Sequence, residues 1–168
     1  MKNWKAIQNS GNAVITAVAS RDKGRSQAFV QACQAEAPFP TQPLALDSYK
    51  ELLASDEVDA VYVPLPTGLR KEWVLLAAQT GKHVLCEKPL GVTVADAEAM
   101  IASCTRANVR LGTAFMMRFH AQHLAALQRV EHRRRLQGED AAERVQIGQV
   151  LLEVGLVPLA GDVAALDV

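Results

Sequence analysis

The sequence predicts an α/β fold, a doubly wound parallel sheet with helices on both of its faces. Short apolar stretches recur at residues 13–19, 58–63, 83–87 and 110–115, and nearly continuous apolar runs of this length are typical of strands buried on both faces. Segments with helical spacing separate these stretches, which indicates βαβ units with right-handed crossovers. Residues that start and stop helices stand between the segments.

The N-terminal part predicts a helix, a turn and the first strand. Residues 2–8 have helical spacing, and Gly11 lies in the polar run that follows them. Gly11 comes after a helix and before a strand, the reverse of a phosphate-binding turn, so we interpret it as a helix stop. Residues 13–19 form the predicted strand.

The next helix begins at Asp22, a residue type that favours the N-cap position, and continues to about residue 35. Its expected inward-facing side chains are Ala28, Phe29, Ala32 and Cys33. Pro38, Pro40 and Pro43 prevent its continuation, and residues 44–46 predict a brief strand.

The middle of the chain repeats this alternation. Ser48 and Glu51 have the spacing of a capping box, which opens a helix that buries Leu52 and Leu53. After the strand at residues 58–63, a further helix is expected to present Leu69, Trp73, Leu76 and Ala77 inward and to end at Gly81.

Thr93 can cap the helix that follows the strand at residues 83–87, because Asp96 lies three residues on. The buried stripe of this helix is expected to be Val94, Ala97, Ile101 and Cys104. We expect Met116, Met117 and Phe119 to be strand-end packing rather than part of a cofactor site, and residues 124–136 to be helical.

Composition limits the protein to one ordinary core. The 168 residues are 49% hydrophobic, and 18 basic residues balance 18 acidic ones, so no global field favours nucleic acid or an anionic membrane. The basic triplet at residues 133–135 stands beside acids, which favours a solvated helix end. No apolar run approaches the ~18 residues of a membrane-spanning helix. An odd set of apolar-flanked cysteines, Cys33, Cys86 and Cys104, favours reduced thiols, and we expect a cytoplasmic protein.

The stretch His83-Val84-Leu85-Cys86-Glu87-Lys88-Pro89 is the most informative in the chain. An apolar strand delivers a carboxylate and an ammonium to its carboxyl end, and a proline then stops it. Ligands of open parallel sheets bind beyond that end, so Lys88 is the first candidate for a catalytic residue. The alternative is a strand-end ion pair between Glu87 and Lys88 without a catalytic role.

The sequence from Val58 to Pro89, with flanks at residues 17–21 and 112–120, resembles the N-terminal domain of the glucose-fructose oxidoreductase and inositol dehydrogenase (Gfo/Idh/MocA) family, near its sugar and dihydrodiol dehydrogenase branch. The triplet Glu87-Lys88-Pro89 is the most specific part of the resemblance. It implies a Rossmann-like NAD(P)-binding domain followed by a larger sheet domain. This chain is too short for both, so we expect a partial Rossmann domain at residues 1–123 and, at residues 124–168, a helix plus a remnant of the second domain.

The resemblance implies roles for several residues. Lys88 would donate to the hydroxyl or carbonyl of a sugar-like or dihydrodiol substrate while hydride moves to or from the nicotinamide, and Glu87 would lie near the nicotinamide ribose. The cofactor would also be bound by Leu65, Pro66, Thr67 and Arg118. Arg70 stands where many members carry His, and we expect a solvated residue there.

The residues after the predicted strand at 13–19, which would be the second strand of the family's domain, bear on the choice of cofactor. NAD enzymes usually place a carboxylate there, whereas Ser20 and Arg21 suit the 2′-phosphate of NADP, because arginine forms charge-assisted hydrogen bonds with phosphate. NADP is therefore favoured over NAD. The alternative is an arginine that is merely solvated at a strand end.

Two expected parts of a Rossmann domain are missing from the sequence. It contains no G-x-G-x-x-G, and the first strand, which would lie between residues 13–19 and 58–63, is absent. These neighbours would have to pair with each other or leave buried backbone groups unpaired, at about 1–3 kcal/mol each. We therefore expect a truncated chain with weak or undetectable dinucleotide binding.

Two hypotheses about function remain open. In the first, the chain is the nucleotide-binding part of an NAD(P)-dependent oxidoreductase for a sugar, polyol or dihydrodiol, and this hypothesis allows a homo-oligomer. In the second, it is a catalytically silent fragment that acts at most as an interaction module with a full-length relative.

Overall fold

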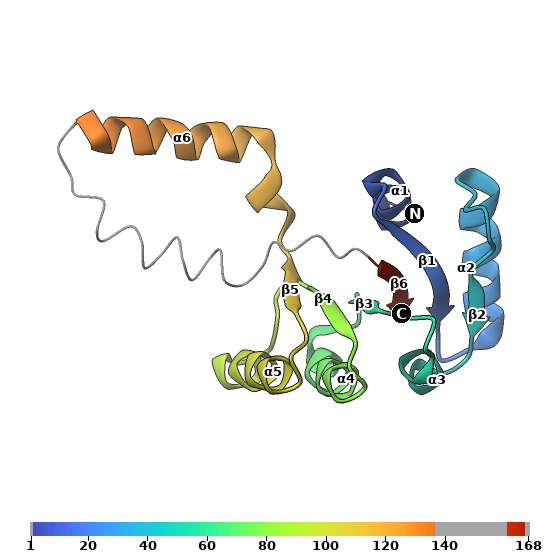
Figure 1. Ribbon diagram of the computed structural model, residues 1–168. Coiled ribbons are helices and arrows are strands. Elements are labelled where there is room, and N and C mark those ends of the chain that lie inside the picture. Colours follow the sequence, from blue (N-terminus) through green and yellow to red (C-terminus); the bar gives the residue numbers. More distant parts are fainter. Residues whose placement is uncertain (1, 137–160, 167–168) are drawn as a thin grey trace.

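The computed structural model describes residues 2–136 and 161–166 and contains one parallel sheet (Figure 1). The sheet has six strands in the order β2-β1-β6-β3-β4-β5. The strands are β1 (Ala13–Ala19), β2 (Leu44–Leu46), β3 (Ala60–Val63), β4 (His83–Glu87), β5 (Leu111–Ala114) and β6 (Gly161–Leu166). The predicted α/β class and parallel sheet are confirmed.

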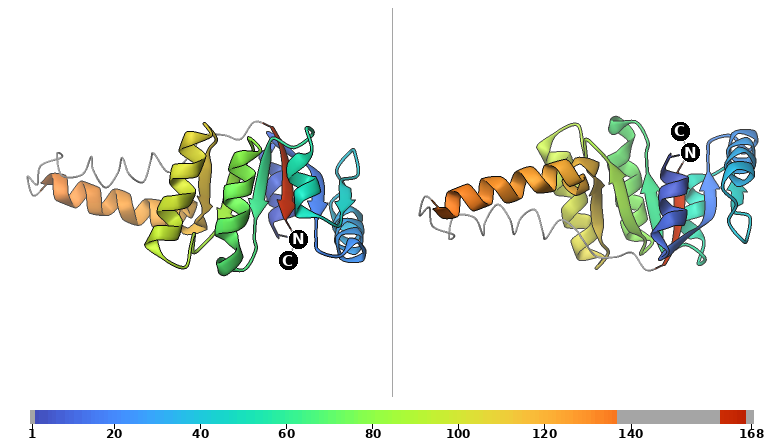
Figure 2. Two further views of the ribbon diagram at one scale, coloured as in Figure 1. Left: turned by 90° about the horizontal axis from the view of Figure 1, so that it is seen from below. Right: turned by 90° about the horizontal axis from the view of Figure 1, so that it is seen from above.

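Helices cover both faces of the sheet, as the doubly wound prediction requires (Figure 2). On one face, Trp4 of α1 and Val30 of α2 pack with Val18 of β1. On the other face, helices α3, α4 and α5 pack against strands β1, β3 and β4 around Val61 and Val84. The helices are α1 (Lys2–Ser10), α2 (Lys23–Glu36), α3 (Tyr49–Ala54), α4 (Thr67–Gln79), α5 (Val94–Arg106), the 3-10 helix η1 (Met116–Phe119) and α6 (Ala121–Leu136).

Strand β6, from the C-terminal end of the chain, lies in the middle of the sheet between β1 and β3. It pairs in parallel with both, through Val14 with Asp162 on one side and Val61 with Ala164 on the other. This is the position of the first strand in the order 3-2-1-4-5-6. The expectation that β1 and β3 would pair with each other or remain unpaired is therefore wrong. Residues 161–166 belong to the sheet although they lie beyond the expected boundary at residue 123, whereas the apolar stretch at residues 145–157 lies outside the described residues.

The helix boundaries follow the predicted local signals. The side chain of Asp22 accepts from the Arg25 amide, that of Ser48 from the Glu51 amide, and Thr93 and Asp96 form a reciprocal capping box. Gly11 and Gly81 adopt φ angles of 69° and 75°, a region that favours glycine and ends α1 and α4 as expected.

The predicted buried stripes of three helices are partly wrong. Helix α2 buries Ser26, Val30 and Cys33 and leaves Ala28 and Ala32 exposed, because it lies at the end of the sheet, where one side of the helix packs against β1, β2 and α1. Helix α5, near the other end, buries Met100, Ser103 and Cys104 and exposes Val94 and Ile101. Helix α4 is rotated by one residue, so that Arg70 is buried and Leu69 exposed.

Candidate functional site

The carboxyl ends of the parallel strands meet at one edge of the sheet, here called the carboxyl edge. Ser20 and Arg21 follow β1, residues 64–67 follow β3, and Lys88 follows β4. Strands β6 and β3 separate β1 from β4. In open α/β sheets ligands bind outside this edge, so the structure brings the predicted site residues to the edge where a dinucleotide is expected.

Lys88 lies at the carboxyl edge with its side chain exposed. Its backbone amide donates to Oε2 of Glu87 over 3.1 Å, and its peptide bond to Pro89 is cis. Within the described part of the chain, Glu87 binds this amide and a tyrosine hydroxyl, and it forms no ion pair with the Lys88 ammonium. The strand-end ion pair considered from the sequence is therefore absent from the structure, and the ammonium faces solvent.

Glu87 is held by a chain of side chains that the sequence analysis missed. The hydroxyl of Tyr62 donates to Oε1 of Glu87 over 2.7 Å, and Nδ2 of Asn3 donates to that hydroxyl over 2.6 Å. Burial, and then the hydrogen bond to Glu87, raise the pKa of Tyr62 far above its usual value of 10.0. The hydroxyl therefore stays protonated at neutral pH and keeps donating to Glu87. Tyr62 of β3 pairs with Leu85 of β4, and Glu87, two residues after Leu85, lies on the same face of the sheet. The alternation of side chains along the two strands could therefore have predicted that Tyr62 and Glu87 are neighbours.

A cavity of about 310 Å³ adjoins this chain of hydrogen bonds. Helix α1 contributes Asn3 and Ile7 to its wall, and strands β3 and β4 contribute Tyr62, Leu85 and Glu87. The described part of the wall is mostly apolar and contains one carboxylate, that of Glu87 near the carboxyl edge. Glu87 thus lies between this cavity and the open edge where Lys88 stands.

Arg70, expected to be solvated, is only 7% exposed. It bridges two loops of the carboxyl edge, the loop after β3 and the loop after β4. Its Nε donates to the carbonyl oxygen of Leu65 over 2.6 Å, and its Nη1 donates to the carbonyl oxygens of Glu87, over 3.0 Å, and Pro89. The expectation failed because a guanidinium carries five donors and can satisfy itself on backbone carbonyls without water. Hydrogen bonds to a charged group contribute about 1.5–3 kcal/mol each, which offsets a desolvation cost of several kcal/mol.

Ser20 and Arg21 differ sharply in exposure. Ser20 is 1% exposed, and its hydroxyl has no hydrogen-bond partner among the residues that the structure describes. Its amide donates to the carbonyl oxygen of Leu46 over 3.1 Å. Arg21 is exposed. The Arg21 guanidinium at the end of β1 is open to solvent and can donate to phosphate oxygens, whereas the Ser20 hydroxyl is enclosed by protein.

The remaining predicted site residues take different positions at this edge. Leu65 is fully enclosed, and Pro66 precedes the first turn of α4, which begins at Thr67. The carbonyl oxygen of Pro66 accepts from the Leu69 amide over 2.9 Å. Arg118 lies in η1 after β5, and its side chain is outside the described part of the structure.

The segment after β5 is exposed, against the expectation of strand-end packing. Met116 is 79% exposed, and Met117 and Phe119 are about half exposed. They belong to η1, which lies between β5 and α6, where the chain leaves the sheet (Figure 1). No element among residues 2–136 and 161–166 covers them, which explains why the expectation is wrong.

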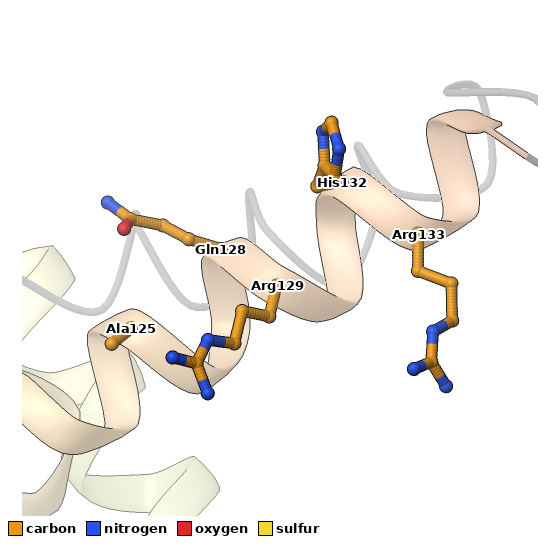
Figure 3. A pocket seen from close by; sticks show the side chains of 5 residues that line it. All are labelled: Ala125, Gln128, Arg129, His132 and Arg133. Carbon is orange, nitrogen blue, oxygen red and sulfur yellow. The ribbon is translucent and has the colours of Figure 1, made fainter.

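A larger hollow lies far from this chemistry. Among the described residues its lining comes from α6 alone, namely from Ala125, Gln128, Arg129, His132 and Arg133. Figure 3 shows that their side chains diverge: Gln128 and His132 point to one side of the helix, and Arg129 and Arg133 to the other. Groups that diverge from one helix cannot converge on a ligand, so the hollow is not a candidate site.

The described residues contain no group of three or more His, Cys, Asp or Glu residues that could hold a metal ion. None of the helices in this part of the chain is both long and apolar enough to cross a membrane.

Comparisons with known proteins agree with this geometry. Residues 1–115 match a family described as an oxidoreductase family with an NAD-binding Rossmann fold. The chain is 46% identical to D-xylose 1-dehydrogenase (NADP(+)) 2 of Haloferax volcanii over 115 residues, which is 68% of this chain and 33% of that enzyme. It is 36% identical to trans-1,2-dihydrobenzene-1,2-diol dehydrogenase of Xenopus laevis over 62% of this chain and 30% of the relative.

A solved relative has the same fold. A 3-ketoreductase from Actinomadura kijaniata, crystallised with NADP and TDP-benzene, superposes with a TM-score of 0.67 at 35% identity, covering 77% of this chain and 37% of that one. The chain thus spans about a third of the length of the relatives that it matches. The protein belongs to the Gfo/Idh/MocA oxidoreductase family and corresponds to its NAD-binding Rossmann domain.

Proposed function

We propose that this chain is the nucleotide-binding part of an NADP-dependent oxidoreductase that acts on a sugar, polyol or dihydrodiol. The observation that carries the proposal is the carboxyl edge, where an exposed Lys88 ammonium and an exposed Arg21 guanidinium stand at the ends of β4 and β1. Two strands separate them, so one elongated ligand can contact both. A dinucleotide is such a ligand, since its nicotinamide and adenosine lie at opposite ends.

Lys88 has the chemistry required at the reacting carbon. The bound nicotinamide would supply or accept hydride, while the Lys88 ammonium donates a hydrogen bond to the substrate oxygen on which charge develops. Glu87 is fixed by Tyr62 and by the Lys88 amide, so its carboxylate would be available near the ribose. The backbone of Leu65, Pro66 and Thr67 would lie along the cofactor between the two ends.

NADP is favoured over NAD because of the end of β1. The exposed guanidinium of Arg21 suits the 2′-phosphate, and neither Arg21 nor the buried Ser20 offers a carboxylate to a ribose 2′-hydroxyl. The names of two relatives support this choice, since the Haloferax volcanii enzyme is called NADP(+)-dependent and the ketoreductase was solved with NADP. Substrates named for the relatives, D-xylose and a dihydrodiol, support the substrate class.

A second candidate function is an interaction module that pairs with a full-length relative. Exposed apolar side chains on η1, Met116 and Phe119 among them, favour it, because a contiguous apolar surface often marks a protein contact. The absence of G-x-G-x-x-G favours it as well, since that turn normally holds the pyrophosphate.

Titration of the protein with NADPH and with NADH tests the proposal. We expect weak binding of both, with NADPH bound about tenfold more tightly, and Arg21→Gln should remove that preference without changing NADH affinity. Arg106→Gln is the matched control, because Arg106 is an exposed arginine in the last turn of α5. Equal affinities, or a preference for NADH, would refute the choice of NADP, and binding of neither cofactor at millimolar concentration would favour the interaction module.

A further inference from the structure

We propose that Arg70 is the positioning residue of Lys88: its guanidinium fixes the backbone on both sides of Lys88 and ties that turn to the end of β3. The inference rests on the role proposed for Lys88. It assigns a function to a residue that touches neither substrate nor cofactor, so Arg70 acts through Lys88 and is not itself catalytic.

The hydrogen bonds of Arg70 are placed symmetrically around Lys88. Nη1 donates to the carbonyl oxygens of Glu87 and Pro89, the residues immediately before and after Lys88. Nε donates to the carbonyl oxygen of Leu65, which follows β3. One rigid, planar group therefore binds the residues on both sides of Lys88 and links them to the end of the neighbouring strand β3. The Lys88 ammonium remains exposed at the carboxyl edge.

The environment of Arg70 indicates that its side chain fixes the backbone of residues 87–89. Its side chain is buried in the first turns of α4, yet in the described part of the chain it forms no ion pair. A buried guanidinium without a carboxylate is costly unless hydrogen bonds compensate. Here Nε and Nη1 donate to backbone carbonyls of the loops after β3 and β4, so these hydrogen bonds join the two loops.

Lysine cannot replace arginine in this arrangement. An ammonium is a single point with three rotatable donors, whereas the planar fork of a guanidinium reaches oxygens that lie in different directions. Arg70→Lys therefore keeps the charge and most of the stem but loses the link between Leu65 and the Lys88 turn. It separates the loss of positioning from the loss of a cation.

The matched control is Lys71→Gln, one residue along the same helix. Lys71 also reaches another element, because its Nζ contacts Oδ1 of Asp96 on α5 over 2.9 Å. Its hydrogen bond and ion pair in the described part of the chain go to Asp96 and not to residues 87–89. The control thus removes a cation and an interhelix contact from α4 while leaving both edge loops unchanged.

The experiment measures amide hydrogen exchange and amide chemical shifts in the full chain, residue by residue, for the wild type, Arg70→Lys, Arg70→Gln and Lys71→Gln. We expect exchange at Lys88 and Leu90 to rise about tenfold or more in both Arg70 variants, as local opening becomes easier. The amides of Gly81 and Asn108, at the opposite edge of the sheet, should not change. Lys71→Gln should leave Lys88 and Leu90 as they are in the wild type.

Kinetics provide the second readout. With NADPH and a sugar-like carbonyl compound, Arg70→Lys should lower kcat about tenfold or more and leave NADPH affinity within about twofold, because a misplaced amine affects the chemical step. Absence of turnover in the wild type would count against the proposed function only, since the exchange measurement needs no activity. Wild-type exchange at Lys88 in Arg70→Lys would overturn the positioning role. So would global unfolding of Arg70→Lys, which would make Arg70 a general stability residue.

Discussion

Removal of strand β6 should unfold the domain. Deletion of residues 161–168 takes away the partner of β1 at six aligned positions and the partner of β3 at three. A parallel ladder has about one hydrogen bond per aligned position, and the net contribution of each is about 0.5–1.5 kcal/mol. The lost hydrogen bonds therefore amount to about 5–13 kcal/mol of unfolding free energy. This is comparable to the total stability of about 5–15 kcal/mol that a domain usually has.

Urea unfolding followed by tryptophan fluorescence measures this effect. Trp4 packs on the face covered by α1 and α2, and Trp73 packs on the face covered by α3, α4 and α5. The two tryptophans therefore report on the two halves of the core. We expect the wild type to unfold in one cooperative transition, and the deletion variant to show no folded baseline.

A single substitution refines the test. Ala164→Pro removes one donor from the middle of the central strand and should cost about 1–3 kcal/mol by leaving a carbonyl unsatisfied. Ala164→Ser keeps the backbone amide and is the matched control. A deletion variant with the midpoint and slope of the wild type would refute the reasoning, because β6 would then contribute nothing to the sheet.

Three further variants test separate parts of the structure. The wild type should lose about 1 kcal/mol of unfolding free energy between pH 10 and 11, because above 10.0 the unfolded tyrosine ionises while the folded Tyr62 hydroxyl, whose pKa is raised, stays neutral. Tyr62→Phe should abolish this loss, and urea unfolding at both pH values measures it. Lys88→Ala should lower turnover about a hundredfold or more and leave NADPH affinity within about twofold, as steady-state kinetics and titration would show; full turnover would make Lys88 structural. Thr93→Ala should cost about 1 kcal/mol in unfolding free energy through loss of the capping box of α5, and an unchanged midpoint would contradict that role.

The sequence predicted features that depend on neighbouring residues. The caps at Asp22 and Thr93 each join groups three residues apart, and Gly81 ends α4 through its own backbone conformation. Such signals are local, so they can be found without knowing the fold. The Glu87-Lys88-Pro89 triplet was found in the same way, because strand, charge and proline are adjacent in the chain.

The features that could not be predicted join distant parts of the chain. Strand β6 pairs with residues more than a hundred positions away, and its sequence carries no sign of that partner. Arg70 was expected in solvent as a charged residue in the first turn of a helix, whereas its burial depends on carbonyls of two loops. The bond from Tyr62 to Glu87 likewise depends on the register of two strands.

Amide chemical shifts of the full chain during titration with NADPH show whether the carboxyl edge binds a dinucleotide. We expect shifts at Arg21, Thr67 and Lys88, which follow three strands at that edge, and none at Gly81 and Asn108, which precede β4 and β5 at the opposite edge. Shifts confined to the opposite edge, or no shifts at millimolar NADPH, would contradict binding at the carboxyl edge.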